Sequence, residues 1–389
     1  MFAYLQRIGR ALMLPIAVLP AAGILLRFGQ SDMLNISWMA DAGNAVFSNL
    51  PLLFAVGVAA GFTADVGTAA VAAAAGYWVF SAVLVDIGVL VYGKEEALNT
   101  GVLGGLMMGL LAATLYQRYH SIRLPEWLAF FGGRRFVPII TAFTGLVLGV
   151  VFGVVWHFPQ AWLTDLANGL VTAGAGGAAV HAFLNRLLIP VGLHHVINTV
   201  VWFQFGDLTN FFCATGNTVG SSCVKGAQGG LFMTGFFPIM LFGLPAAALA
   251  MYTTARAANR KVVGGILFSA ALTSIITGIT EPIEFSFMFV APVLYALHAV
   301  LTGISAFVTI SLGIRDGFTF SAGLIDYLIN FNIAKQPILL LGVGVVFAVI
   351  YYFSFVFVIR ALDIPTPGRE PEAVEEFGEV PAEGAAAPA

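Results

Sequence analysis

Two glutamates, Glu281 and Glu284, lie inside an apolar stretch of the sequence. A charged side chain at the centre of a bilayer costs at least about 2.5–3.5 kcal/mol on insertion scales, so it needs a partner, a watery cavity or a neutralising proton. Pro282 lacks an amide hydrogen and disfavours helical geometry in the residue before it, so we expect the helix to break at Glu281. Transporters place substrates at broken helices, which makes Thr280 and Glu281 a candidate binding site. For Glu284, a structural role at the helix start is an equal alternative.

A second interrupted segment, residues 185–198, also carries polar side chains. Pro190 and Gly192 break its apolar run just before two adjacent histidines. Imidazole donates and accepts hydrogen bonds near neutral pH, which suits a polyhydroxylated ligand, although a single histidine is more often a packed core residue. Successive helical residues point about 100° apart, so we expect only one of the two histidines to face a cavity. Arg186 is interpreted either as a surface anchor or as an anion contact. The candidate residues of this segment are Arg186, His194, His195 and Asn198.

The other motifs that carry chemistry are weak or absent. Cys213 and Cys223 have no metal-ligand spacing, and a bridge between them requires an oxidising compartment. We find no Walker motif, zinc spacing or nucleophile elbow, and therefore expect no metal and no cofactor. The histidines interpreted as surface or packing residues are His120, His157, His181 and His298.

The composition places these residues in a membrane. The chain has 389 residues, of which 59% are hydrophobic and 10% charged, with a mean hydropathy of +0.93. Soluble globular proteins carry roughly 25% charged residues. This composition excludes a water-soluble enzyme, a nucleic-acid-binding domain and a secreted disulfide scaffold. Residues 363–389 form an acidic segment rich in proline and alanine, which we expect to be disordered.

Ten apolar stretches are long enough to cross or nearly cross a bilayer. Basic residues cluster at four places, which the positive-inside rule assigns to the cytoplasmic side. Two clusters on the same side must be separated by an even number of crossings. Four apolar stretches separate the first two clusters, but only three strong ones separate the second from the third and the third from the fourth. Residues 187–205, and either 312–331 or a break within 284–311, must supply the missing crossings. The ten predicted spans are 11–28, 45–62, 67–92, 99–117, 136–157, 168–184, 230–253, 262–280, 284–311 and 336–359.

Two further features concern the first half of the chain. Residues 120–135 mix bulky aromatic residues with arginine, which predicts an amphipathic interfacial helix or an ordinary loop with aromatic anchors. Glycine recurs every fourth residue in two stretches, and such ladders permit close helix contact, either between subunits or within the chain. The ladder residues are Gly101, Gly105, Gly109, Gly145, Gly149 and Gly153.

Several motifs resemble the glucose superfamily of phosphotransferase-system (PTS) sugar permeases, the enzyme IIC component. They are ITEPIEF at 279–285, LIPVGLHH at 188–195 and GLPAAA at 243–248. Others are similar to the N-acetylglucosamine branch of this family in particular. These lie at residues 6–20, 27–30, 130–138, 235–240 and 366–370.

The resemblance implies an all-α polytopic membrane protein with about ten transmembrane helices plus two re-entrant hairpins, assembled as a homodimer. It implies an N-terminal scaffold and dimerisation domain over residues 1–160, including the interfacial segment. A sugar transport domain would follow over residues 161–362, with the tail at 363–389. The two hairpins of the family coincide with the two places where crossings are missing.

The resemblance also assigns roles within the site. Glu281 and one of the paired histidines, for which we favour His194, would bind the sugar near its 6-hydroxyl and orient that group for reaction. Arg186 matches a family arginine close to the site, and the apolar Met240 disfavours glucose as substrate. The full expected binding set is Glu281, His194, His195, Arg186, Thr280, Asn198 and Glu284. The aromatic residues expected to stack on the ring are Trp202, Phe203 and Phe285.

We therefore expect an N-acetylglucosamine permease of the phosphoenolpyruvate-dependent system in a bacterial inner membrane, with both termini cytoplasmic. Neither cysteine lies in a phosphocysteine context, so a separate phosphorylated IIB protein would supply the phosphoryl group, and no nucleic acid is involved. The alternatives are a glucose, glucosamine or glucoside permease, a proton-coupled transporter with Glu281 as proton carrier, and a sugar sensor.

Overall fold

The computed structural model describes residues 11, 15, 17–93, 98–191, 194–204, 211 and 229–369. Over these ranges the protein is helical and contains no β-strand, only an isolated bridge between Arg315 and Lys335. Both cysteines and the acidic tail beyond residue 369 lie outside the described residues.

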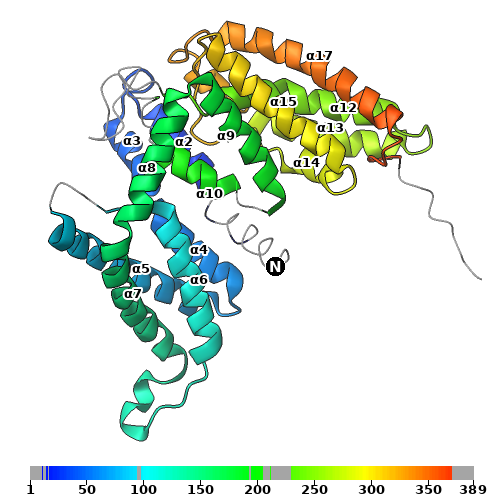
Figure 1. Ribbon diagram of the computed structural model, residues 1–389. Coiled ribbons are helices and arrows are strands. Elements are labelled where there is room, and N and C mark those ends of the chain that lie inside the picture. Colours follow the sequence, from blue (N-terminus) through cyan, green and yellow to red (C-terminus); the bar gives the residue numbers. More distant parts are fainter. Residues whose placement is uncertain are drawn as a thin grey trace, which may run out of the picture.

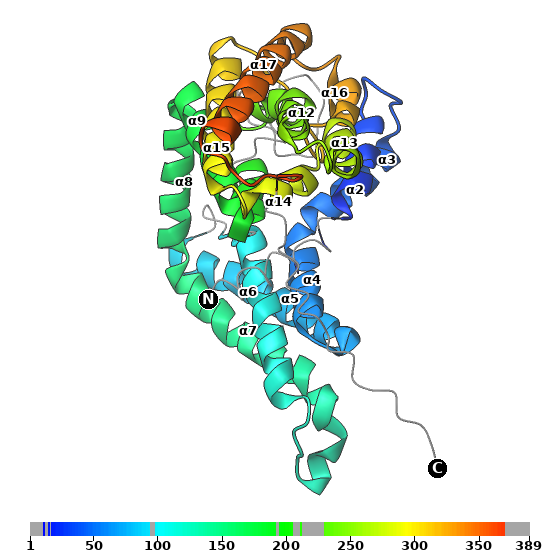
Figure 2. The ribbon, with the colours of Figure 1, turned by 90° about the vertical axis from the view of Figure 1, so that its right-hand side faces the viewer.

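The helices form two bodies (Figure 1). In both views α4 to α7 lie together at one end, and α9 and α12 to α17 lie together at the other (Figures 1 and 2). Between them α8 (His157–Thr172) runs along one side. The helices of the first half are α2 (Leu19–Phe28), α3 (Ser37–Ser48), α4 (Leu50–Phe62), α5 (Val66–Tyr92), α6 (Gly101–Tyr119) and α7 (Phe136–Val155). Those of the second half, after α8, are α9 (Ala175–Leu188), α10 (His194–Thr199), α12 (Leu244–Thr254), α13 (Arg260–Thr277), α14 (Glu281–Met288), α15 (Pro292–Ser311), α16 (Leu324–Asn330) and α17 (Pro337–Ala361).

Within the described residues, six helical segments are long and apolar enough to cross a membrane. Counting α3 and α4 as one span bent by 54° gives seven. The multi-pass membrane architecture is therefore confirmed, whereas the predicted count of ten is not. The six segments are Val66–Tyr92, Gly133–Val155, Thr234–Thr254, Arg260–Thr277, Pro292–Ser311 and Pro337–Ala361.

The structure contradicts one predicted span and decides between two interpretations of another segment. The predicted span 168–184 is not one helix, because α8 ends at Thr172 and α9 begins at Ala175. Gly174 between them has φ +54°, a left-handed conformation that interrupts a right-handed helix. Of the two interpretations of residues 120–135, the structure favours the loop, because the segment contains two short 3-10 turns, Glu126–Phe131 and Gly133–Arg135, and no continuous α-helix.

The glycine ladders pack helices within the chain. A Cβ at Gly145 would lie 2.6 Å from the carbonyl oxygen of Gly76, which joins α7 to α5. A Cβ at Gly109 would lie 2.5 Å from the carbonyl oxygen of Ala55, which joins α6 to α4. These helices approach so closely that any side chain at the two positions would collide with a backbone. Of the two interpretations of the ladders, the structure supports intrachain packing.

The N-terminal helix α2 packs against the second half of the chain. Arg27 is fully buried, and its Nε donates a hydrogen bond to the carbonyl of Ile329 at 3.0 Å. A Cβ at Gly23 would lie 2.7 Å from the side chain of Thr319. Both α2 and α3 accordingly lie beside the second body in Figures 1 and 2. The first helices of the chain thereby help to build the site described below.

Candidate functional site

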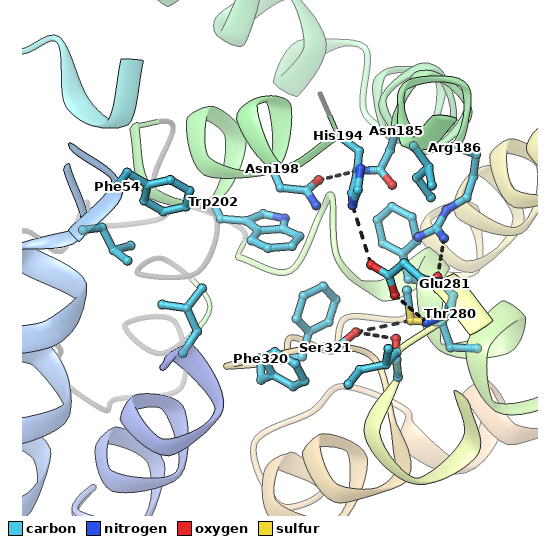
Figure 3. Close-up of a pocket in the computed structure, with 18 residues that line it drawn as sticks. Phe54, Asn185, Arg186, His194, Asn198, Trp202, Thr280, Glu281, Phe320 and Ser321 are labelled. Atoms are coloured by element: carbon cyan, nitrogen blue, oxygen red, sulfur yellow. Dashed lines mark hydrogen bonds and ion pairs between the residues drawn. The ribbon is translucent and has the colours of Figure 1, made fainter. Parts of the chain in front are cut away.

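A cavity of about 110 Å³ lies where α9, α10 and the start of α14 meet (Figure 3). The N-terminal helices contribute Leu19, Leu50 and Phe54 to its lining. Five of the seven residues expected to bind substrate line this cavity. They are Arg186, His194, Asn198, Thr280 and Glu281.

The predicted helix break is present and places Glu281 at the cavity. α13 ends at Thr277, Gly278 has φ +72°, and α14 begins at Glu281. A Cβ at Gly278 would lie 2.8 Å from the backbone nitrogen of Gly323, so a glycine fits both the conformation and the space. The hydroxyl of Ser321 donates to the carbonyl of Gly278 at 2.8 Å. The break is therefore held by specific contacts, as irregular backbone inside a membrane protein must be.

The carboxylate of Glu281 points toward His194 (Figure 3). Its Oε1 lies 3.9 Å from Nε2 of His194, and its Oε2 accepts a hydrogen bond from the backbone amide of Thr280 at 3.1 Å. The Glu281 side chain is 29% exposed, whereas that of His194 is 10% exposed. Glu281 thus keeps acceptor capacity on the cavity side, and the imidazole is close enough to share a ligand with it.

Glu284 is fully buried and does not line the cavity. Its Oε1 accepts a hydrogen bond from Nη1 of Arg186 at 2.5 Å and lies 3.1 Å from Nε2 of His298. The same Arg186 nitrogen donates to the hydroxyl of Thr280 at 3.1 Å. Glu284 and His298 are completely buried, and Arg186 is 4% exposed. This geometry favours the structural alternative for Glu284, since the ion pair ties α9 to the first turn of α14.

His298 was missed as a partner in this network. It was interpreted as a surface or packing residue, but it is buried and bonds Glu284 on one side and the hydroxyl of Tyr351 on the other, at 2.9 Å. The sequence holds one usable signal, namely a histidine in the middle of an apolar span. Its partner could not be read from spacing, because the two residues lie on separate helices, α14 and α15.

The opposite side of the cavity is largely aromatic. Trp202 and Phe320 face the polar group of Glu281, His194 and Arg186 across the space in Figure 3. Trp202 thus lies where a ring-stacking residue was expected. Phe285 is not among the lining residues and is 48% exposed. The side chains of His195 and Phe203 lie outside the described residues.

An amide pair forms part of the polar wall. Nδ2 of Asn185 donates to Oδ1 of Asn198, which is one of the predicted binding residues. Both side chains are buried and line the cavity. Asn185 was not selected from the sequence, although it opens the interrupted segment 185–198.

A loop ahead of α16 supplies three lining residues that sequence reasoning did not single out: Phe318, Phe320 and Ser321. Asp326 holds this loop, because its Oδ1 accepts from the amide of Thr319 at 2.7 Å and from the Thr319 hydroxyl at 2.8 Å. Only the missing crossing near 312–331 pointed to this region. Asp326, an acid in a weakly apolar stretch, was the local signal that could have found it.

The arrangement suits a neutral, polyhydroxylated ring. One wall offers a carboxylate acceptor, an imidazole and amide groups, and the other offers aromatic faces that cover apolar edges. Among the described residues no group of three or more histidine, cysteine, aspartate or glutamate side chains is placed to hold a metal ion.

Comparison with known proteins gives a consistent result. The family model "Phosphotransferase system, EIIC" matches residues 9–303. The N-acetylglucosamine-specific EIIC component of Streptomyces coelicolor is 51% identical over 394 residues, which cover 96% of this chain and 94% of that protein. The N-acetylglucosamine-specific EIICBA component of Escherichia coli is 50% identical over 375 residues, covering 94% of this chain and 56% of that protein. The glucosamine-specific EIICBA component of Bacillus subtilis is 48% identical over 379 residues, covering 95% of this chain and 60% of that protein.

Proposed function

Because the chain belongs to the phosphotransferase-system EIIC family, we propose that it is a permease that takes up N-acetylglucosamine for phosphorylation on the 6-hydroxyl. The single observation that carries the proposal is the broken helix at Gly278–Thr280, which places the partly exposed carboxylate of Glu281 beside His194 and opposite an aromatic wall. The two relatives named above as N-acetylglucosamine-specific support the choice of sugar.

Each polar residue has a role in this proposal. Glu281 accepts hydrogen bonds from sugar hydroxyls, which are stronger than neutral hydrogen bonds because the acceptor is ionised. His194 binds the 6-hydroxyl and takes its proton during transfer. Arg186 acts mainly through Thr280 and Glu284, which it contacts, and so fixes the start of α14. Asn198 binds a further hydroxyl or the acetamido group, while Trp202 stacks on the ring.

The phosphoryl donor is a separate phosphorylated IIB protein that docks at the cytoplasmic side. The 6-hydroxyl oxygen attacks phosphorus, the bond from phosphorus to the donor cysteine breaks, and the hydroxyl proton passes to His194. The product carries charge, so a site that binds a neutral sugar releases it to the cytoplasm and does not return it. Buried polar groups left without their hydroxyl partner reject an incorrect sugar strongly. The protein acts as a homodimer in a bacterial inner membrane, with both termini in the cytoplasm.

The test is a binding assay with radiolabelled N-acetylglucosamine on purified protein. Glu281→Gln should weaken binding by about ten- to a hundred-fold, since a hydrogen bond to a charged group contributes about 1.5–3 kcal/mol. Glu126→Gln is the matched control, because Glu126 is exposed on a 3-10 turn and does not line the cavity. Wild-type affinity in Glu281→Gln would reject the assigned site.

Two further measurements separate the alternatives. Competition by unlabelled glucose, glucosamine and glucosides ranks the sugars, and stronger competition by any of them than by N-acetylglucosamine would overturn the specificity. Uptake into vesicles should require a phosphoryl donor. Uptake that follows a pH gradient without any donor would identify a proton-coupled transporter, and binding without uptake would identify a sensor.

A further inference from the structure

A second cavity, of about 610 Å³, lies along the outer side of the helix pair α12 and α13 and is separate from the sugar site. Its lining is mostly apolar and includes Leu249, Phe268, Leu272 and Ile275. Leu249 is 52% exposed and Phe268 70%. Only 17% of the apolar window of α13 is buried in the protein, so this helix presents most of its surface to the surrounding bilayer. We call this cavity the α12–α13 groove.

The groove has the length of a lipid chain. Its lining on α13 extends from Arg260 to Ile275, which at 1.5 Å per residue corresponds to about 22 Å. One leaflet contributes about half of the ~30 Å hydrocarbon core. A single acyl chain inserted from one leaflet therefore fits along the groove.

One end of the groove is basic. Arg260 and Lys261 line it at the start of α13, and no acidic residue lies among the lining residues that the structure describes. The Nη2 atom of Arg260 donates to the backbone carbonyls of Thr253 and Ala255 at 3.3 and 3.2 Å, which fixes the guanidinium at this end. Lys261 is exposed. In Figure 1 the loop that joins α12 to α13 lies near the C-terminal end of α17, whose last turn carries the basic Arg360.

The positive-inside rule assigns this end to the cytoplasmic leaflet, which is rich in anionic lipid. Two basic residues at the end of an apolar groove, Arg260 held by backbone carbonyls and Lys261 exposed, are complementary to an anionic headgroup whose acyl chain lies along the groove. A zwitterionic lipid carries an additional positive charge that these residues do not favour. Basic pockets between membrane helices on the cytoplasmic side are a recognised form of lipid site.

We propose that the α12–α13 groove binds one anionic phospholipid, with an acyl chain between the two helices and the phosphate against Arg260 and Lys261. The buried face of α13, next to the groove, contacts the wall of the sugar cavity, because the hydroxyl of Ser274 donates to the carbonyl of Met240 at 2.8 Å and Met240 lines that cavity. The bound lipid thus packs against the helix that leads into the break at Gly278.

Native mass spectrometry of purified protein tests the proposal with phosphatidylglycerol and phosphatidylcholine of identical acyl chains. Wild-type protein should retain phosphatidylglycerol about tenfold more than phosphatidylcholine, and Lys261→Gln should lose most of that preference. Arg360→Gln is the matched control, because Arg360 is also an exposed basic residue at a helix end but does not line the groove. Equal retention of the two lipids by the wild type, or an equal loss in Arg360→Gln, would overturn the proposal.

The acyl-chain part of the proposal is tested by filling the groove. Ala271→Leu, at a lining position, should lower retention of both lipids several-fold. Gly342→Leu adds the same side chain on α17, at an exposed position with open space and outside the groove, and should leave retention unchanged. Sugar binding by each variant confirms that it is folded. Unchanged lipid retention in a folded Ala271→Leu variant would show that the acyl chain does not bind in the groove.

Discussion

Glu281 and Glu284 lie three residues apart on one helix, yet the structure predicts that their substitution affects different properties of the protein. Glu284→Gln removes the charge that compensates Arg186, from which it accepts a hydrogen bond at 2.5 Å. Both side chains are almost completely buried, at 0% and 4% exposure, so solvent cannot replace the lost charge. Glu281 is 29% exposed, and its Oε1 lies 3.9 Å from Nε2 of His194. Glu284→Gln should therefore act on stability, and Glu281→Gln on sugar binding.

The magnitude follows from the cost of an uncompensated buried charge. Removing one partner of a buried ion pair costs about 3–5 kcal/mol, which corresponds to a roughly 150- to 4,000-fold shift of the folded-to-unfolded ratio. Glu281→Gln leaves no buried arginine without its carboxylate and should change stability by less than about 1 kcal/mol. Arg186→Met combined with Glu284→Gln removes both charges of this buried pair and still offers His298 an acceptor. The double variant should regain at least about half of the loss.

Equilibrium unfolding in mixed micelles with increasing sodium dodecyl sulfate measures these differences, followed by the fluorescence of the six tryptophans. Glu284→Gln should unfold at a clearly lower detergent fraction than wild type, and Glu281→Gln close to wild type. Two results would refute the reasoning. One is a Glu284→Gln variant within about 0.5 kcal/mol of wild type, and the other is a double variant no more stable than Glu284→Gln alone.

The remaining predictions concern the loop ahead of α16 and the start of α5. Asp326→Ala removes the acceptor for the amide and hydroxyl of Thr319 and should weaken sugar binding by about tenfold, as measured by calorimetry, whereas Asp41→Ala at an exposed position should not. Asp65 caps α5, and hydrogen bonds from Thr68 lower the pKa of its carboxyl. The ionised carboxyl therefore stabilises the fold fully above the ordinary pKa of 3.8, and this contribution is lost as pH falls through the lowered pKa. The melting temperature of wild type should exceed that of Asp65→Ala at pH 7, and the difference should shrink as pH falls below 3.8. A gap that is independent of pH would show that the charge of Asp65 does not contribute.

The helix break could be predicted from sequence because its causes are local. Pro282 follows an acid inside an apolar stretch, and these two facts alone place the boundary at Glu281, where α14 begins. The count of crossings between basic clusters also located the weak segments that contribute to the cavity. Neither prediction required knowing which residues distant in sequence contact each other.

The contacts that hold the site could not be predicted in the same way. Glu284 meets His298 only because α14 and α15 fold against each other, and Arg186 reaches Glu284 from 98 residues away. Asp326 supports the cavity through a loop whose apolar pattern is too weak to mark it. The prediction of one continuous helix over 168–184 could have been avoided from the sequence, because Gly174 permits the turn between α8 and α9.

The breaks that create this site also limit which side chains are able to bind sugar. Irregular backbone inside a bilayer persists only when its polar groups are satisfied by the protein. Here the hydroxyl of Ser321 satisfies Gly278, and Arg186 bonds Thr280, so these side chains are already used to hold the break. Substrate recognition then falls to polar groups that face the cavity, foremost the carboxylate of Glu281, whose Oε1 lies beside His194. Changes of sugar preference within this architecture should therefore arise at such residues and in the aromatic wall, whereas changes to the residues that hold the break should remove binding of every sugar alike.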